Sequence, residues 1–225
     1  MKANLSALAL LAVSMPFTLC ATTYLDVTGD SSTVASLDIT SVVVNNDATT
    51  LNLQINLAGN PLSPDWVKCL IGFDTVTGGN TTGPDAWGKP IFMSAGGTDF
   101  FVGSWMDSGT GAEVRSWSGS SWDAVAGSGI AVGTGASSVT LSLNLSAMGL
   151  SEGSTFNFDI YTTSDGNSAL DAAGNSTALT WNNNPYDSSP NVLSYTVTAV
   201  PEPGALSLAG LGTLLLAWRA KQRKA

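Results

Sequence analysis

The sequence predicts an all-β protein, a two-sheet antiparallel β-sandwich of the jelly-roll type, flanked by an N-terminal signal helix and a C-terminal single hydrophobic helix. Three observations support this fold class. Apolar and polar residues alternate in several short segments, as in strands that bury one face. Clusters of Gly, Asn, Asp and Ser separate these segments and favour turns. The central region shows no convincing amphipathic helical period.

Two segments show the alternation most clearly. In residues 51–57 and 139–145, leucine, isoleucine or valine occupies every second position and a polar residue stands between. The other expected strands are 37–44, 67–74, 99–105, 113–118, 156–162 and 192–198, and residues 145–150 are compatible with one helical turn. Eight or nine short strands, each with one polar face, predict two sheets packed face to face rather than one open sheet.

The first 21 residues have the features of a secretory signal peptide. Lys2 supplies a positive charge, residues 5–13 form an apolar core, and short residues before Thr22 offer a cleavage site. Cys20 raises the alternative of a lipoprotein, but Leu19 is larger than the residue that normally precedes a lipidated cysteine. We therefore expect a mature chain that begins near Ala21 or Thr22.

The other end of the chain, residues 200–225, has three parts in a fixed order. Val200, Pro201, Glu202 and Pro203 are followed by an apolar run at 205–218 and then by a basic cluster. Proline cannot donate to a strand ladder, so the body ends here. The basic cluster favours the cytoplasmic side of a membrane. As a helix the apolar run would reach about 21 Å, short of the roughly 30 Å hydrocarbon core, so a buried terminal helix is the alternative.

This tail resembles the PEP-CTERM sorting signal of bacterial surface and secreted proteins. The motif falls on Val200, Pro201, Glu202 and Pro203. The resemblance implies an exosortase, a membrane-embedded cysteine protease, as a partner that cuts the tail. It also implies an intermediate anchored in the membrane by the C-terminal helix, followed by delivery to the cell envelope, cell surface or extracellular matrix. The expected parts are a signal peptide at 1–21, a β-sandwich domain at 22–199 and a sorting signal at 200–225.

Charge limits what the body can bind. Residues 22–200 hold three basic residues against sixteen acidic ones, a formal net charge of −13. Nucleic-acid binding is excluded, because phosphate neutralisation requires clustered Lys and Arg. Such acidity suits solubility outside the cell and cation binding.

The residue types argue against catalysis. The chain has no histidine, which excludes His-dependent triads and most zinc or copper sites. Cys69 lies in an apolar segment and is expected to be a small buried side chain. Glu113 and Glu152 are the only glutamates of the body, although aspartate pairs leave a weak glycan hydrolase as an alternative. No phosphate-binding loop or nucleophile elbow is present, so we expect a protein without enzymatic activity.

The body also resembles a family. Residues 26–30, the segments 37–44 and 51–57, and the later segments 71–75, 99–105 and 158–160 are similar to DOMON-like carbohydrate-binding domains related to family 9 modules. The resemblance covers most of residues 24–198. It implies a sandwich that binds sugars or a structural calcium ion, without catalysis of its own.

Two sets of residues permit this chemistry. Flat aromatic rings pack on the apolar faces of sugars, and the candidates in or beside loops are Trp87, Trp117, Trp122, Trp181 and Tyr186; Trp66 and Trp105 are expected in the core. Calcium prefers clustered oxygen ligands, and two oxygen-rich segments offer Asp26 and Asp30, and Asp165, Asn167 and Asp171. The alternative is that these residues only form turns. We expect a surface protein that binds polysaccharide or contributes to matrix; the alternative is a structural, glycosylated envelope protein without a specific ligand.

Overall fold

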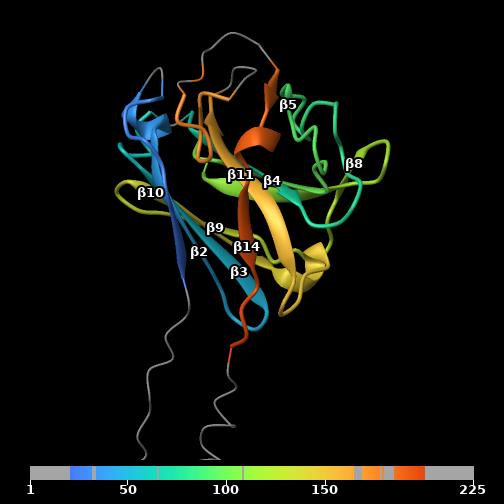
Figure 1. Cartoon of the computed structure of the whole chain (residues 1–225). Coiled ribbons are helices and arrows are strands. Elements are labelled where there is room, and N and C mark those ends of the chain that lie inside the picture. Colours follow the sequence, from blue (N-terminus) through green and yellow to red (C-terminus); the bar gives the residue numbers. More distant parts are fainter. Residues whose placement is uncertain are drawn as a thin grey trace, which may run out of the picture.

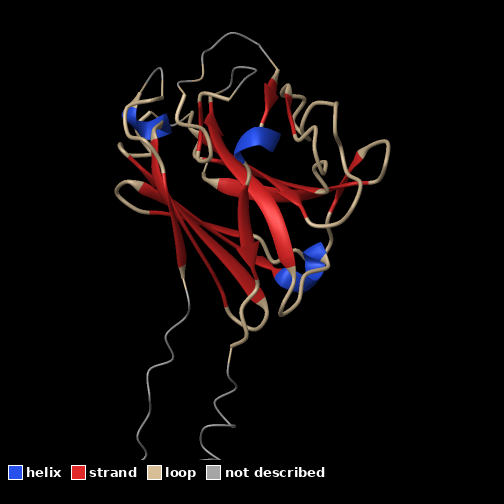
Figure 2. Ribbon diagram, viewed as in Figure 1, coloured by secondary structure: helices blue, strands red, loops and turns tan. Residues whose placement is uncertain are grey.

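The computed structural model describes residues 21–31, 34–64, 66–107, 109–164, 169–177, 179 and 185–200. The predicted signal helix and C-terminal helix lie outside these residues. Within the described chain nearly all regular structure is strand, joined by the short 3₁₀ helices η1 (Ala35–Leu37), η2 (Leu145–Met148) and η3 (Ser189–Asn191) (Figure 2). The all-β prediction is confirmed, and η2 is the single turn expected at 145–150.

One antiparallel sheet contains the strands with the clearest alternation. Its order in the described residues is β1 (Thr22–Leu25), β2 (Ile39–Asn46), β3 (Thr50–Leu57), β10 (Ser138–Asn144) and β9 (Ala131–Thr134). Leu53 pairs with Leu141 in the β3–β10 register, so both strands turn their apolar residues to the same face. That face is buried, whereas the asparagines and serines between remain partly exposed.

The second sheet packs against the first (Figure 1). Its order is β12 (Asp171–Ala172), β11 (Thr155–Thr163), β4 (Lys68–Asp74), β6 (Phe100–Trp105), β7 (Gly111–Trp117) and β8 (Trp122–Ala124), and β14 (Leu193–Thr196) also pairs with β11. One continuous apolar core lies between the sheets, with Leu53, Ile55 and Leu141 meeting Phe73, Phe156 and Phe158. The described body is therefore a β-sandwich.

A second, smaller core lies on the outer face of this sheet. Leu70, Phe101 and Tyr161 point away from the main core and are covered by the loop segments that carry β5 (Ile91–Phe92) and β13 (Tyr186–Asp187). These two short strands pair in parallel. The second sheet is thus buried on both faces near β4 and β11, which explains the continuous burial of β4 from Lys68 to Phe73.

The two described chain ends meet at one end of the sandwich (Figure 1). Thr22 pairs with Val44 at the start of β1. Two residues later, Asn46 bonds Thr198 through both its amide oxygen and its amide nitrogen. Thr22 and Thr198, near the two ends of the described body, therefore lie at the same end of the sandwich.

Candidate metal centre and aromatic face

Four tryptophans gather on the outer surface of β6, β7 and β8, and we call them the aromatic face. Trp105, Trp117 and Trp122 come from the three strands, and Trp87 comes from the loop before β5. Their ring centroids are 6.1 Å apart for Trp87 and Trp105 and 5.3 Å apart for Trp117 and Trp122. Phe101 lies between the two pairs, 5.6 Å from Trp87 and 6.2 Å from Trp122. All four tryptophans are partly exposed.

Two glycines make room for these rings on the sheet. A Cβ atom at Gly103 would lie 2.4 Å from Cζ2 of Trp87, and one at Gly111 would lie 2.2 Å from Cζ2 of Trp105. Since real side chains do not approach so closely, both positions require the absence of a side chain. The rings can therefore lie directly against the backbone of β6 and β7.

The polar edges of the aromatic face are bonded within the protein. Trp87 Nε1 donates to Glu113 Oε1 at 2.6 Å, and Trp122 Nε1 donates to the Pro84 carbonyl at 3.2 Å. Glu113 also forms an ion pair with Arg115 at 2.7 Å. Burial acts to raise the pKa of Glu113, but hydrogen bonds from Arg115 and Trp87 outweigh it and hold that pKa below its usual value. The face thus combines apolar ring surface with a charged pair at its centre.

The predicted aromatic residues lie in different environments in the structure. Trp87, Trp117 and Trp122 lie together as one surface, and Trp66 packs on the main core as expected. The expectation for Trp105 was wrong, because its position in β6 alternates with the inward Ser104 and points to the outer face. Trp181 lies outside the described residues.

Tyr186 is also a correction. Only 9 % of its surface is exposed, and its hydroxyl donates to Oδ2 of Asp159 at 3.3 Å. It belongs to the smaller core under the loops. Its ring therefore has no open face on which a sugar could stack.

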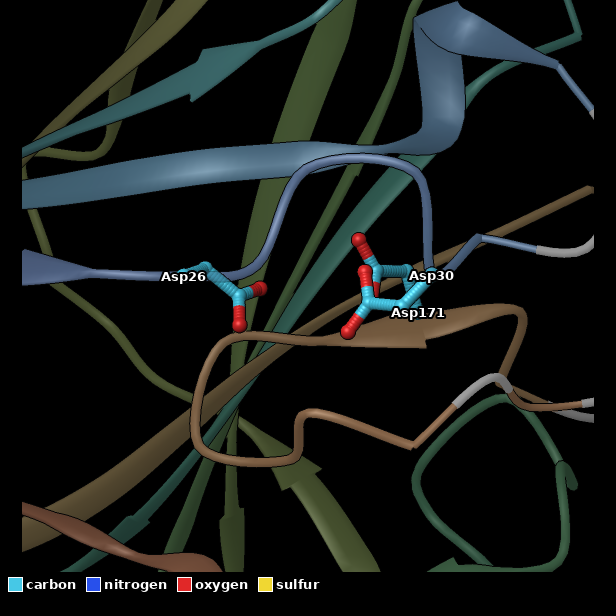
Figure 3. A group of neighbouring side chains, drawn as sticks. All are labelled: Asp26, Asp30 and Asp171. Atoms are coloured by element: carbon cyan, nitrogen blue, oxygen red, sulfur yellow. The ribbon is translucent and has the colours of Figure 1, made fainter.

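A group of three aspartates lies at the edge where the two sheets meet (Figure 3). Asp26 and Asp30 belong to the loop that follows β1, and Asp171 belongs to β12. One carboxylate oxygen from each lies within 4.8 Å of the others. The sequence placed these residues in two separate oxygen-rich segments, and the fold brings them into one cluster.

Burial and mutual repulsion perturb all three carboxyl groups. Burial raises the pKa of Asp26 to about 7, with Asp30 and Asp38 adding repulsion, and it raises the pKa of Asp30 as well. The pKa of Asp171 also rises to about 7, again mainly by burial. The charges that act on these groups are other carboxylates. The arrangement therefore favours a bound cation or proton.

The remaining predicted ligands, Asp165 and Asn167, lie outside the described residues. A neighbour that the sequence did not single out is Asp159 on β11, which is fully buried. Burial, reinforced by the charge of Asp26, raises the pKa of Asp159 to about 8. It lies between Phe158 and Ile160, which face the main core, so it shares the outer face of the sheet with Tyr161, and its signal in the sequence was an acidic residue within a strongly apolar strand.

Comparison with known families identifies the tail. Residues 199–224 match the family described as the PEP-CTERM protein-sorting motif. The chain carries a PEP-CTERM sorting motif. The match covers the tail and leaves the body unassigned; no curated protein and no solved structure matches the chain.

The PEP-CTERM motif implies export, a membrane-anchored intermediate and processing by an exosortase-type protease, which makes this a secreted or surface protein. Of the motif, Val200 lies at the end of the described chain, and Pro201, Glu202 and Pro203 lie beyond it. Within the residues that the structure describes, none of the helices has the length and apolar character needed to cross a bilayer.

Proposed function

We propose that this PEP-CTERM protein is a non-catalytic polysaccharide-binding sandwich of the DOMON-like type, displayed at the cell surface or in the extracellular matrix. The observation that carries the proposal is the aromatic face. Four partly exposed tryptophans on one surface offer several sugar-sized apolar contacts in a row.

The polar groups on this face support a sugar ligand. The pair Glu113–Arg115 lies beside Trp87, where a carboxylate and a guanidinium can accept and donate hydrogen bonds to hydroxyl groups. Because Trp87 and Trp122 satisfy their ring nitrogens internally, their exposed surface is mainly apolar. This division into apolar ring faces and central polar groups suits a ligand with C–H faces and equatorial hydroxyls.

The angles between the rings favour one kind of polysaccharide. Trp87 and Trp105 are inclined by 48°, and Trp117 and Trp122 by 58°. A flat crystalline surface would contact only one ring of each pair. A soluble chain whose successive sugar units turn relative to each other can contact both, so a single hydrated chain is the proposed ligand.

The proposal is tested by glycan-array binding of the full-length chain, followed by titration with the best soluble glycan. Trp117→Ala and Trp122→Ala should each weaken binding about tenfold, which corresponds to the loss of about 1.4 kcal/mol of ring contact with the sugar. Leu25→Ala, which alters an exposed residue of the other sheet, is the matched control and should bind as the wild type. Absence of selective binding by the wild type would instead support a passive structural envelope protein.

A further inference from the structure

We propose that Asp26, Asp30 and Asp171 bind one calcium ion that joins the two sheets at their shared edge. Asp26 and Asp30 follow β1 of the first sheet, and Asp171 lies in β12 of the second. This inference is independent of the aromatic face, which lies on β6, β7 and β8.

The spacing of the carboxylates fits the ion. Calcium binds oxygen at about 2.3–2.6 Å, so two ligand atoms on opposite sides of one ion are separated by about 5 Å. One oxygen from each of the three aspartates lies within 4.8 Å of the other two. A single ion can therefore contact all three without a rearrangement of the backbone (Figure 3).

The hydrogen bonding of Asp30 distinguishes this cluster from an ordinary acidic surface. Only 8 % of the residue is exposed, yet neither of its carboxylate oxygens has a hydrogen-bond partner on another described residue. Oδ2 of Asp26 is likewise buried and unpartnered among the described residues. Burial of a carboxylate without hydrogen bonds or a counter-ion is costly, and a cation between these oxygens removes that cost.

Hydrogen bonds hold the other ligand groups in place. Asp171 accepts from the backbone nitrogens of Ile39 at 2.6 Å and of Ala172 at 2.8 Å. Oδ1 of Asp26 accepts from the nitrogen of Val27 at 3.0 Å, which leaves its second oxygen for the ion. Asp38 accepts twice from the nitrogen of Gly29 and so fixes the loop between Asp26 and Asp30. The carboxylates of Asp26 and Asp171 are therefore held in position before an ion binds.

The donor set selects calcium by chemistry. All three ligands are hard carboxylate oxygens, and the chain has no histidine and only a fully buried cysteine in its described body. Three carboxylates supply three to six oxygens, and water or backbone carbonyls complete the six to eight ligands that calcium takes. A divalent cation also offsets most of the repulsion among these groups, since the charges that act on Asp26 and Asp171 come from other carboxylates.

The test is calcium titration of the full-length chain, purified in detergent and freed of metal with a chelator. Isothermal titration should give a dissociation constant of about 0.1–1 mM, as in extracellular calcium modules, and the melting temperature should rise with calcium concentration. Asp30→Asn should abolish both effects. Asp123→Asn, at an exposed position of β8, should retain both.

Two further measurements test whether Asp30 is a metal ligand and whether the site prefers calcium. In chelator, Asp30→Asn should melt no lower than the wild type, because it removes an unpartnered buried charge; a lower melting temperature would show that the carboxylate has a purely structural role and would overturn the proposal. Magnesium at equal concentration should raise the melting temperature less than calcium does. Calcium binding that survives Asp30→Asn, no binding by the wild type, or an equal effect of magnesium would each contradict the assignment.

Discussion

Replacement of Asn46 by alanine should destabilise the body by about 3 kcal/mol and loosen the chain just before the sorting motif. Asn46 is 1 % exposed. Its oxygen accepts from the Tyr195 hydroxyl at 2.8 Å, from the Thr198 nitrogen at 2.9 Å and from the Thr198 hydroxyl at 3.1 Å. Its nitrogen donates to the carbonyls of Asp47 at 2.9 Å and Thr198 at 3.0 Å.

The expected loss of unfolding free energy depends on which hydrogen-bond partners of Asn46 water can reach after the substitution. A protein hydrogen bond contributes about 1 kcal/mol net, and a buried group left unpaired costs about 1–3 kcal/mol. Tyr195 is buried, whereas Thr198 is only partly buried and can be rehydrated. Loss of the bond to Tyr195, at about 1 kcal/mol, and partial loss of the four other bonds together give about 3 kcal/mol.

Urea unfolding of the full-length chain, followed by tryptophan fluorescence, measures this change. Asn45→Ala is the matched control, because Asn45 is the preceding residue of β2 and its side chain accepts one bond, from Asn52 at 3.2 Å. It should cost at most about 1 kcal/mol. Limited proteolysis should cut the Asn46→Ala protein faster after Val197. A loss below about 1 kcal/mol for Asn46→Ala would refute the argument that this side chain fastens the C-terminal end of the body.

Three other outcomes follow from single positions. Burial raises the pKa of Asp159 to about 8 in the folded protein, so the stability that this group contributes is present below about pH 4 and is lost as pH rises to 8. In the presence of chelator, the unfolding free energy of the wild type should therefore fall between pH 5 and 7, and Asp159→Asn should make that fall smaller by about 1.4 kcal/mol per pH unit. The same slope in both proteins would contradict this. Gly97 has φ +92° and a Cβ there would lie 2.0 Å from the Gly78 carbonyl, so Gly97→Ala should lower the urea midpoint clearly more than Gly127→Ala, where φ is also positive but no atom lies within 4 Å. Burial raises the pKa of Cys69 to about 12, so peptide mapping should find this thiol unmodified by an alkylating reagent until the protein unfolds.

The strands that the sequence predicted well are those with one buried face and one solvent-exposed face. The expected segment 51–57 differs from β3 by one residue at its start, and 139–145 differs from β10 by one residue at each end. The register is strongly specified because a slip by one residue would expose every leucine. By contrast β1, β8 and β9 are short, polar or glycine-rich, and their positions depend on neighbours in the sheet rather than on their own pattern. Local alternation cannot reveal such strands.

The candidate site was likewise predictable from the sequence only in part. Residue chemistry pointed to Asp26, Asp30 and Asp171, but only the pairing of β12 with β11 and the packing of the sheets bring residues 26 and 171 together. Trp105 was assigned to the core because its neighbours are apolar. Gly103 and Gly111, each beneath a tryptophan ring, carried the missing signal that this side of the sheet receives large aromatic groups.

Both ends of the described body lie near Asn46, which fixes the end of the sandwich at which the sorting motif begins. β1 runs away from that end, so Asp26, which follows its last residue, lies at the opposite end of the strand. The sorting motif at residues 199–224 begins at the end near Asn46, so an anchor in that segment holds the body by this end. Cleavage of that segment by an exosortase-type protease therefore occurs at the end away from Asp26, Asp30 and Asp171 and leaves these carboxylates in place.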